Sequence, residues 1–344
     1  MIFDIKLFDE KDVKGWDNFV MRNDNTTFFH QIGWKNVVEE TYGHKPYYLF
    51  AENDNGKVIG ILPMFLIKNV ILGKRLISVP FASYGGACSE NEDVGKALVD
   101  KAIQIGEDLG VDFYEFRSVG SSNMYKNFKD MKGYSTFVLD ISNGKDYIWK
   151  EMNKKIRNMV RKGEKNNLKF EIEINYDIIS KFFEIYSENM RHLGTPVHNK
   201  KFFENIYRSF AKDVIISTAK LNEDAVSSIY LLKFKDTIVS GWASSLVESL
   251  KYAPNDFVYW NSIKYACTND ILKFDFGRSL TKSDNSKFKE RWGCTEFLLN
   301  YYYLPSTEIL LPSQNKYGTF AKVWSKLPSN VTKIVGPRVR KYIP

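Results

Sequence analysis

The chain has 344 residues, of which 44% are hydrophobic and 15% aromatic, so it can bury two sizeable cores and is not dominated by disorder. Its three cysteines are far apart and form no CxxC pair, and its four histidines add no metal-ligand spacing, which argues against a disulfide framework or a metal site. A net charge of +8 favours an anionic partner such as RNA, a nucleotide diphosphate or a membrane face, although a solvated basic surface would give the same count.

The N-terminal region predicts a cytoplasmic protein. Its first residues, MIFDIKLFDEKDVKGW, carry charges where a secretion signal needs an apolar segment. No apolar run elsewhere reaches the roughly 18 residues that a membrane-spanning helix needs. We therefore expect no spanning segment.

The first half of the chain predicts alternating strands and helices. Residues 47–66 indicate two strands joined by an Asn-Asp-Asn-Gly turn. The segment SVPFASYGG follows at 78–86, then a helical pattern at 97–110, and then the apolar strand VDFYEFRS, which ends in Arg117-Ser118.

The second half repeats this order. Residues 214–234 indicate another pair of strands, and Ala219 lies 168 residues after Ala51. VSGWASSLV at 239–247 then matches SVPFASYGG, and a helix is predicted at 257–270. The strand ILKFDFGRS ends in Arg278-Ser279, and Arg278 lies 161 residues after Arg117. Four similar blocks in the same order indicate a duplication, so we predict an α/β (α+β) protein with two similar domains, each with a mixed central sheet covered by helices.

Composition places the domain boundary near residues 140–150, where an apolar strand gives way to Ser-Asn-Gly-Lys-Asp and a basic helix. We predict a first domain over 1–147 and a second over 148–305. The tail, 306–344, lies beyond the second copy.

The segment 151–165, EMNKKIRNMVRKGEK, predicts a helix with a basic stripe. Lys154, Arg157, Arg161 and Lys165 share one face at helical spacing, while Ile156 and Val160 lie on another. Arginine binds phosphate well because its planar fork contacts two oxygens at once. A solvated charged face is the competing interpretation.

The clearest candidate site is FDFGRSLTKSDNSKFKERWG, residues 274–293. A strand ends at Arg278 and Ser279, a polar loop follows, and order resumes at Phe288 and Lys289. Ligands collect at the carboxyl ends of strands in α/β sheets, and a lysine there could stabilise the oxyanion formed when an amine attacks an ester or thioester. An ordinary surface loop is the alternative.

Aromatic residues crowd the second copy, and most are expected in the core. Trp242 is the one that we expect to line a ligand channel. The sequence contains no G-x-S-x-G elbow, no Walker loop and no cysteine with an evident histidine partner, so direct transfer to a bound amine fits better than a covalent protein intermediate.

The chain resembles the FemABX-like aminoacyl and acyl transferases along nearly its whole length. The matching segments are FFHQIGWKNV, SVPFASYGG, FYEFRS, KKIRNMVRKGEKNNL, NMRHLGTPVH, GWASS, FDFGRS and FKERWG. The resemblance implies two tandem GNAT domains, with the tail of 306–344 packed back on the first. It also implies amide-bond formation with Phe288 and Lys289 at the acyl-transfer site.

The same resemblance implies roles for several other residues. Arg157 or Arg161 would meet the diphosphate of a peptidoglycan-type precursor, and Arg117 and Tyr84 of the first domain would shape the acceptor cleft. Members of the family that act on peptidoglycan carry a lysine about one turn after the residue matching Trp34, where this chain has Val37 and Val38. The exact acceptor therefore stays open.

Three functions remain open at this point. The first is transfer from aminoacyl-tRNA to a cell-envelope precursor, with no cofactor and with peripheral membrane contact. The second is N-acyl transfer from acyl-CoA or acyl-carrier protein to an amino sugar or peptide, although the GNAT pyrophosphate loop is degraded at Glu92–Ala97 and is not recognisable near Ala253. The third is a binding module without catalysis, against which the FKERWG segment argues.

Overall fold

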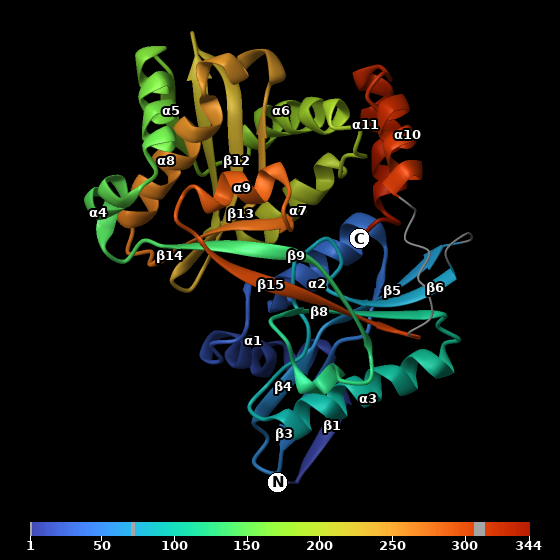
Figure 1. The fold of residues 1–344 in the computed structure, drawn as a ribbon. Helices are drawn as coiled ribbons and strands as arrows, with labels where there is room; N and C mark the ends of the chain where they lie inside the picture. The colour runs from blue at the N-terminus through green and yellow to red at the C-terminus, as the bar shows by residue number, and fades with distance from the viewer. Residues whose placement is uncertain (1, 70–72, 306–313) are drawn as a thin grey trace. The chain divides into compact units, whose positions relative to one another are not determined.

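The computed structural model describes residues 2–69, 73–305 and 314–344, and Figure 1 shows its elements in chain order. The described residues form two compact units: residues 2–69, 73–134 and 298–305 belong to unit 1, and residues 135–297 and 314–343 belong to unit 2. The chain passes from one unit to the other within two strands, β9 (Lys129–Asp140) and β15 (Thr295–Leu304).

Unit 1 contains two sheets and three α-helices among its described residues. Its strands are β1 (Phe3–Leu7), β2 (Lys45–Pro46), β3 (Leu49–Asn53), β4 (Val58–Leu62), β5 (Met64–Asn69), β6 (Gly73–Ser78), β7 (Cys88–Ser89) and β8 (Phe113–Val119). Its helices are α1 (Val13–Arg22), α2 (Ile32–Tyr42) and α3 (Glu92–Asp108), with 3-10 turns at Glu10–Asp12, Phe28–His30 and Asn123–Tyr125.

A proline divides the sheet of unit 1. β4 pairs with β3 and β7, whereas β5 pairs with β2 and β6, and Pro63 is the residue between β4 and β5. Proline has no N–H to donate to a strand ladder, so it is expected where a strand leaves one sheet for another. β6 then pairs in parallel with β8, with α3 between them in the chain.

Unit 2 repeats this order of elements around one sheet. Its helices are α4 (Gly144–Glu151), α5 (Lys154–Lys165), α6 (Ile178–His192), α7 (Lys200–Phe210), α8 (Pro254–Cys267), α9 (Asp284–Glu290), α10 (Gln314–Trp324) and α11 (Ser329–Arg340), with a 3-10 turn at Val247–Tyr252. Its strands are β10 (Lys169–Glu173), β11 (Val214–Leu221), β12 (Asp224–Phe234), β13 (Thr237–Ser245) and β14 (Lys273–Leu280), and the order in the sheet is β10-β11-β12-β13-β14-β9.

The central strand of this sheet is buried on both faces. Successive residues of β12 point to opposite sides, so Ile229 and Leu231 join the core under α5 and α8, while Tyr230 packs against α6 and α7 through Phe182 and Phe203. A nearly continuous apolar run predicts a strand of this kind. The mixed α/β fold with a duplicated unit, expected from the sequence, is confirmed.

The C-terminal tail packs on unit 2, whereas the family resemblance led us to expect it on the first domain. Lys333 of α11 pairs with Glu184 of α6, and Arg191 donates a hydrogen bond of 3.0 Å to the carbonyl oxygen of Ser325. Gly194, with φ of +69°, lies so close to Ala321 that a Cβ at position 194 would be 2.4 Å from the Ala321 carbonyl oxygen. This docking depends on side chains of α6 that no pattern in the tail itself could reveal.

The unit boundary also differs from the prediction. It falls between Tyr134 and Ser135, inside β9, rather than at residue 147, and residues 298–304 belong to unit 1 rather than to the second domain. The turn at 141–144, where we placed the boundary, instead leads into α4, and the Gly144 N–H donates a 3.0 Å hydrogen bond to the carbonyl oxygen of Ile141. A polar segment indicates a turn but does not show whether the turn separates two domains, and this turn lies within unit 2.

Candidate active site

The candidate site begins where two parallel strands of unit 2 separate. β13 and β14 pair from Thr237–Lys273 to Val239–Asp275, and the described pairing ends there. Gly241 lies at a bulge in β13, and Gly277 of β14 has φ of +74°, a left-handed conformation that favours glycine. A Cβ at position 277 would also approach the carbonyl oxygen of Ser240 to 2.9 Å. The last residues of β14 therefore leave the ladder.

The ammonium of Lys289 lies against this end of β14. Lys289 is only 7% exposed, and its Nζ donates hydrogen bonds to the carbonyl oxygens of Gly277 at 2.7 Å and Arg278 at 3.2 Å. A protonated amine has three N–H groups, and these two bonds are the ones described for Lys289. Nζ also lies 5.8 Å from the centre of the Phe137 ring, so within the described residues one N–H donor has no acceptor oxygen or nitrogen assigned to it.

A short helix, rather than the expected loop, positions Lys289. α9 begins after Ser283, whose Oγ accepts a hydrogen bond of 3.2 Å from the Ser286 N–H. A serine N-cap of this kind satisfies one of the N–H groups that the first turn of a helix leaves unpaired. Several of the polar residues that indicated a loop are thus the cap and first turn of α9.

A buried carboxylate balances the charge of Lys289. Asp275 is 3% exposed, and its Oδ1 accepts hydrogen bonds from Thr136 Oγ1 at 2.6 Å and from the Gly277 N–H at 2.7 Å. Burial lowers the pKa of Lys289 to about 8, although the charge of Asp275 opposes this shift. The ammonium is therefore the main form at neutral pH, and it can lose its proton more easily than a surface lysine.

An aromatic wall lies beside α9, on the side of α8. Tyr259 of α8 stacks on Phe276 with ring centroids 4.9 Å apart, and Phe288 and Trp292 lie within 6.2 Å of Tyr259. The Trp292 Nε1 is buried and has no hydrogen-bond partner in the described part of the chain, as is also true of Ser279 Oγ. This wall excludes water, which strengthens electrostatic interactions at the site.

Arg278 is exposed, in contrast to its neighbours on β14. Its positive charge is among the influences that lower the pKa of Lys289. The structure thus brings together four residues that the sequence indicated: Phe288 and Lys289 on α9, and Arg278 and Ser279 at the end of β14.

The predicted basic stripe lies on α5. Ile156 and Val160 are buried, as expected, and Arg161 is exposed with its guanidinium 5.5 Å from the centre of the Trp149 ring. Arg157 donates hydrogen bonds to the carbonyl oxygens of Trp149 at 3.2 Å and Lys150 at 2.9 Å. Arg157 thus caps the C-terminal end of α4, where cations are favourable, and Arg161 is the better placed of the two to meet a ligand.

Trp242 does not join the lysine site by any described contact. It is half-buried and packs edge-on against Phe202 and Phe203 of α7, with ring centroids 5.4 and 5.2 Å apart. Ser240, two residues earlier, instead shares a 3.2 Å hydrogen bond with the Tyr259 hydroxyl. The bulge at Gly241 turns β13, so the two side chains face different helices.

Residues 150–290 match the acetyltransferase (GNAT) domain family. The matched segment contains the separated strands, Asp275, Arg278 and Lys289. This segment, which is less than half of the chain, is therefore similar to GNAT domains.

Solved structures share the fold over most of the chain. FemX is 14% identical with a TM-score of 0.65, and the match covers 86% of this chain and 96% of FemX. The C-terminal domain of an Agrobacterium fabrum protein assigned as a lysylphosphatidylglycerol synthetase is 14% identical with a TM-score of 0.58, and 96% of each chain is covered. A tandem GNAT protein from the clavulanic acid biosynthesis pathway is 9% identical with a TM-score of 0.56, covering 90% of this chain and 100% of that protein. No curated protein sequence matches the chain.

These matches confirm the tandem GNAT fold and the FemABX-like architecture that the sequence motifs predicted. At such low identity the neighbours establish the fold alone. The chemistry proposed below therefore rests on the residues of the site.

In unit 1, the arginine that corresponds to Arg278 is sequestered. Arg117 is 2% exposed, forms a 2.6 Å ion pair with Glu115, and donates a 2.7 Å hydrogen bond to the carbonyl oxygen of Ala82. Tyr84 is also buried and packs edge-on against Phe29. The guanidinium of Arg117 thus holds the 79–86 loop, whereas Arg278 of unit 2 is an exposed residue.

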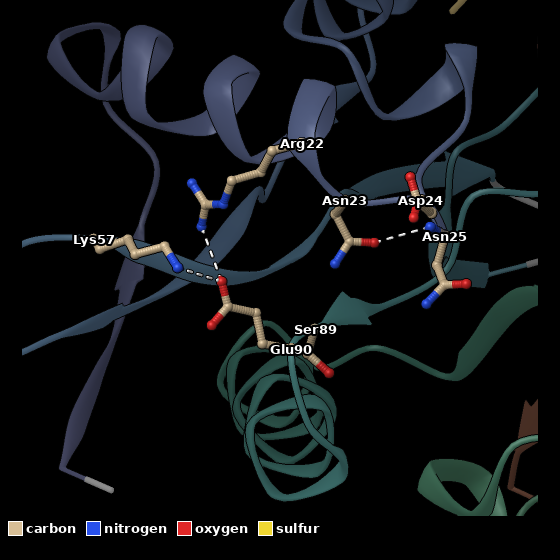
Figure 2. Close-up of a pocket in the computed structure, with 7 residues that line it drawn as sticks. All are labelled: Arg22, Asn23, Asp24, Asn25, Lys57, Ser89 and Glu90. Atoms are coloured by element: carbon tan, nitrogen blue, oxygen red, sulfur yellow. Dashed lines mark hydrogen bonds and ion pairs between the residues drawn. The ribbon is translucent and has the colours of Figure 1, made fainter. Parts of the chain in front are cut away.

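A separate hollow of about 440 Å³ lies in unit 1, where no sequence motif had indicated a site. Figure 2 shows that Arg22 and Lys57 both reach Glu90, at 3.2 and 2.8 Å. The remaining lining residues are Asn23, Asp24, Asn25 and Ser89. Because its two cations share one carboxylate, the hollow lacks the concentrated charge that would select a phosphate.

Two acidic residues of unit 2 were missed from the sequence. Asp275 is the lone acid in an apolar strand, and this isolated position is a sequence signal for a buried carboxylate. Asp256 lies in the first turn of α8, is 8% exposed, and has a pKa raised to about 6 by burial. A carboxylate in that turn disfavours a phosphate at the helix N-terminus, because two negative charges would then compete for one positive helix end.

The described residues also offer no cluster of metal ligands. No group of three or more His, Cys, Asp or Glu suited to a metal occurs within residues 2–69, 73–305 and 314–344.

Proposed function

We propose that this protein is a transferase that forms an amide bond, moving an aminoacyl or acyl group onto an amine of a cell-envelope precursor of peptidoglycan type. We take aminoacyl-tRNA as the donor and the cytoplasm as the place of reaction. The observation that carries the proposal is the buried Lys289 ammonium, which is held by the carbonyl oxygens of Gly277 and Arg278 beside Asp275 and keeps one N–H donor in reserve.

The chemistry follows from this geometry. The acceptor amine attacks the ester carbonyl carbon, a C–N bond forms, and negative charge develops on the carbonyl oxygen. The remaining N–H of Lys289 donates to that oxygen, in a site where aromatic side chains exclude water. The intermediate then collapses, the ester C–O bond breaks, and the proton lost by the amine goes to the leaving oxygen.

A covalent enzyme intermediate is disfavoured by the cysteines of unit 2. Burial raises the pKa of Cys294 well above its ordinary value, and it also raises the pKa of Cys267. Neither thiol would form the thiolate that nucleophilic catalysis requires. Direct transfer to the bound amine therefore remains the simplest path.

Three observations support an aminoacyl-tRNA donor and an anionic acceptor. Arg161 is exposed on α5 and suits a diphosphate. Asp256 occupies the helix end at which a CoA pyrophosphate would bind in an ordinary GNAT protein. The structural neighbours include FemX and a protein assigned as a lysylphosphatidylglycerol synthetase, and the second name refers to a membrane lipid that carries an amino acid.

The alternative is N-acyl transfer from acyl-CoA or acyl-carrier protein to an amino sugar or peptide. It is favoured by the match of residues 150–290 with an acetyltransferase family. Lys289 could serve the same role there, because a thioester also forms an oxyanion when an amine attacks it.

Donor competition distinguishes these functions. Purified protein is incubated with a diphosphate-containing peptidoglycan precursor and either radiolabelled aminoacyl-tRNA or radiolabelled acetyl-CoA, and label in the precursor is counted. We expect transfer from aminoacyl-tRNA. Transfer from acetyl-CoA alone would establish the alternative and overturn our first proposal. Precursor binding without transfer from either donor would leave a binding module.

A further inference from the structure

The positive charge of the chain is concentrated in its C-terminal tail. Residues 314–344 contain seven Lys or Arg and no Asp or Glu, whereas residues 1–313 contain 42 Lys or Arg and 41 Asp or Glu. The net charge of +8 is therefore almost entirely a property of α10, α11 and the residues around them. A charge this localised indicates a surface for an anionic partner.

The outer face of α11 is apolar. Val331, Ile334 and Val335 are exposed by 39%, 62% and 38%, and Arg338 is exposed as well. These residues follow the i, i+3, i+4, i+7 spacing of one helical stripe. In a water-soluble helix such a stripe normally faces the core, yet here it faces outward.

The opposite face of α11 is already occupied by unit 2. Thr332 and Gly336 are buried, and Gly336 lies against Val197. Lys333 pairs with Glu184 of α6 at the edge of this contact. The outward stripe is therefore not needed to hold the helix in place.

α10 presents a second apolar surface with the same character. Phe320 and Val323 are exposed by 40% and 60%, and Lys322 and Lys326 beside them are also exposed. Trp324 is buried and stacks on Phe320, with ring centroids 5.3 Å apart. Figure 1 shows α10 and α11 as neighbouring helices at the C-terminal end of the chain. Both helices thus combine exposed apolar side chains with exposed cations.

We propose that the outward faces of α10 and α11 form a docking surface for an anionic membrane. Apolar side chains would enter the boundary between headgroups and acyl chains, and Lys322, Lys326 and Arg338 would contact the lipid phosphates. RNA fits this surface less well, because a phosphate backbone gives valine and isoleucine nothing apolar to bury against. No described helix is long and apolar enough to span a bilayer, so the contact is peripheral.

Vesicle sedimentation tests the proposal with the full chain and without substrates, so the result does not depend on the transfer reaction. The vesicles are phosphatidylcholine alone or phosphatidylcholine with phosphatidylglycerol, each at low and high salt. We expect binding to the anionic vesicles at least about tenfold tighter than to the neutral ones, and weakened by salt. Equal binding to both compositions, or no binding to either, would overturn the proposal.

Two sets of variants separate the charged and apolar parts of the surface. Lys322→Gln, Lys326→Gln and Arg338→Gln together should weaken anionic-vesicle binding about a hundredfold, because each cation near the surface contributes about 1 kcal/mol. Val323→Ser with Ile334→Ser should weaken it roughly tenfold, through lost apolar burial. Thermal melting checks that each variant is folded.

Matched controls come from unit 1. Leu7→Ser with Met21→Ser removes two side chains that are 53% and 56% exposed, and should leave vesicle binding unchanged. A tRNA filter-binding assay provides the competing outcome. If the three glutamine substitutions abolish tRNA binding while wild-type protein ignores anionic vesicles, the surface belongs to RNA and the membrane proposal fails.

Discussion

Lys289 and Gly277 are joined by a 2.7 Å hydrogen bond between a buried ammonium and a backbone carbonyl oxygen, twelve residues apart in the chain. The bond forms because Gly277 takes a left-handed conformation just after β14 leaves β13, so that its carbonyl can meet the end of α9. The ammonium group of a lysine held in this way has a fixed orientation and is shielded from water. A donor that stabilises an oxyanion requires both properties.

Removing the side chain of Lys289 should abolish most of the activity. We expect Lys289→Ala to lower kcat by at least about a hundredfold, which corresponds to about 2.7 kcal/mol of transition-state stabilisation. Lys287→Ala is the matched control, because Lys287 is an exposed residue of the same helix. Steady-state transfer assays on both variants make the comparison, and near-normal turnover by Lys289→Ala would remove this residue from the mechanism.

The alkaline limb of the pH–rate profile should report Lys289. Its ammonium is the active form and its pKa is about 8, so kcat/KM should fall as the pH rises through that value. Asp275 raises the pKa of Lys289, so Asp275→Asn should move the limb to lower pH while keeping an amide oxygen as the acceptor for Thr136. An unchanged limb in Asp275→Asn would show that another group titrates.

Stability should also depend on the protonation of Lys289, with a definite sign. Its pKa is about 8 in the folded state and about 10.5 in the unfolded chain, so the unfolded state binds more protons between these values. Stability therefore rises with pH across that window, by up to about 3 kcal/mol from this group. Urea unfolding of the wild type and of Lys289→Met at pH 7.5 and 10 measures this dependence. Between the two pH values, the free energy of unfolding of the wild type should rise relative to that of Lys289→Met.

Arg161 and Arg157 should differ in what their loss affects. Arg161→Glu should weaken binding of the diphosphate-containing precursor by about tenfold or more and reduce its salt dependence, with little change in stability. Arg157→Glu should in addition lower stability by about 1 kcal/mol, because Arg157 caps the carbonyl groups of α4. Lys162→Glu is a control on another face of the same helix. Calorimetric titration with the precursor measures the affinity of each variant. If Arg161→Glu and Lys162→Glu weaken precursor binding equally, the basic stripe is only a solvated surface.

The sequence by itself determined the architecture and the position of the candidate lysine. The repeat offsets of 168 and 161 residues reflect hydrophobic spacing and turn residues, which are local properties that survive in each copy. Lys289 could be placed because it lies close in sequence to a strand end, and strand ends are where ligands gather. The basic stripe of α5 was likewise visible from helical spacing alone.

Only the tertiary structure decided what surrounds these residues. Asp275, Thr136 and Lys289 come from three elements, and their hydrogen bonds exist only after β9 and β14 lie side by side. Tertiary packing also explains why Arg117 is buried in an ion pair with Glu115 while Arg278 is exposed. The two arginines occupy matching positions in the repeat. The docking of the tail on α6 depended on close packing at Gly194. Local sequence specifies elements, whereas charge balance, burial and docking depend on which distant surfaces fold together.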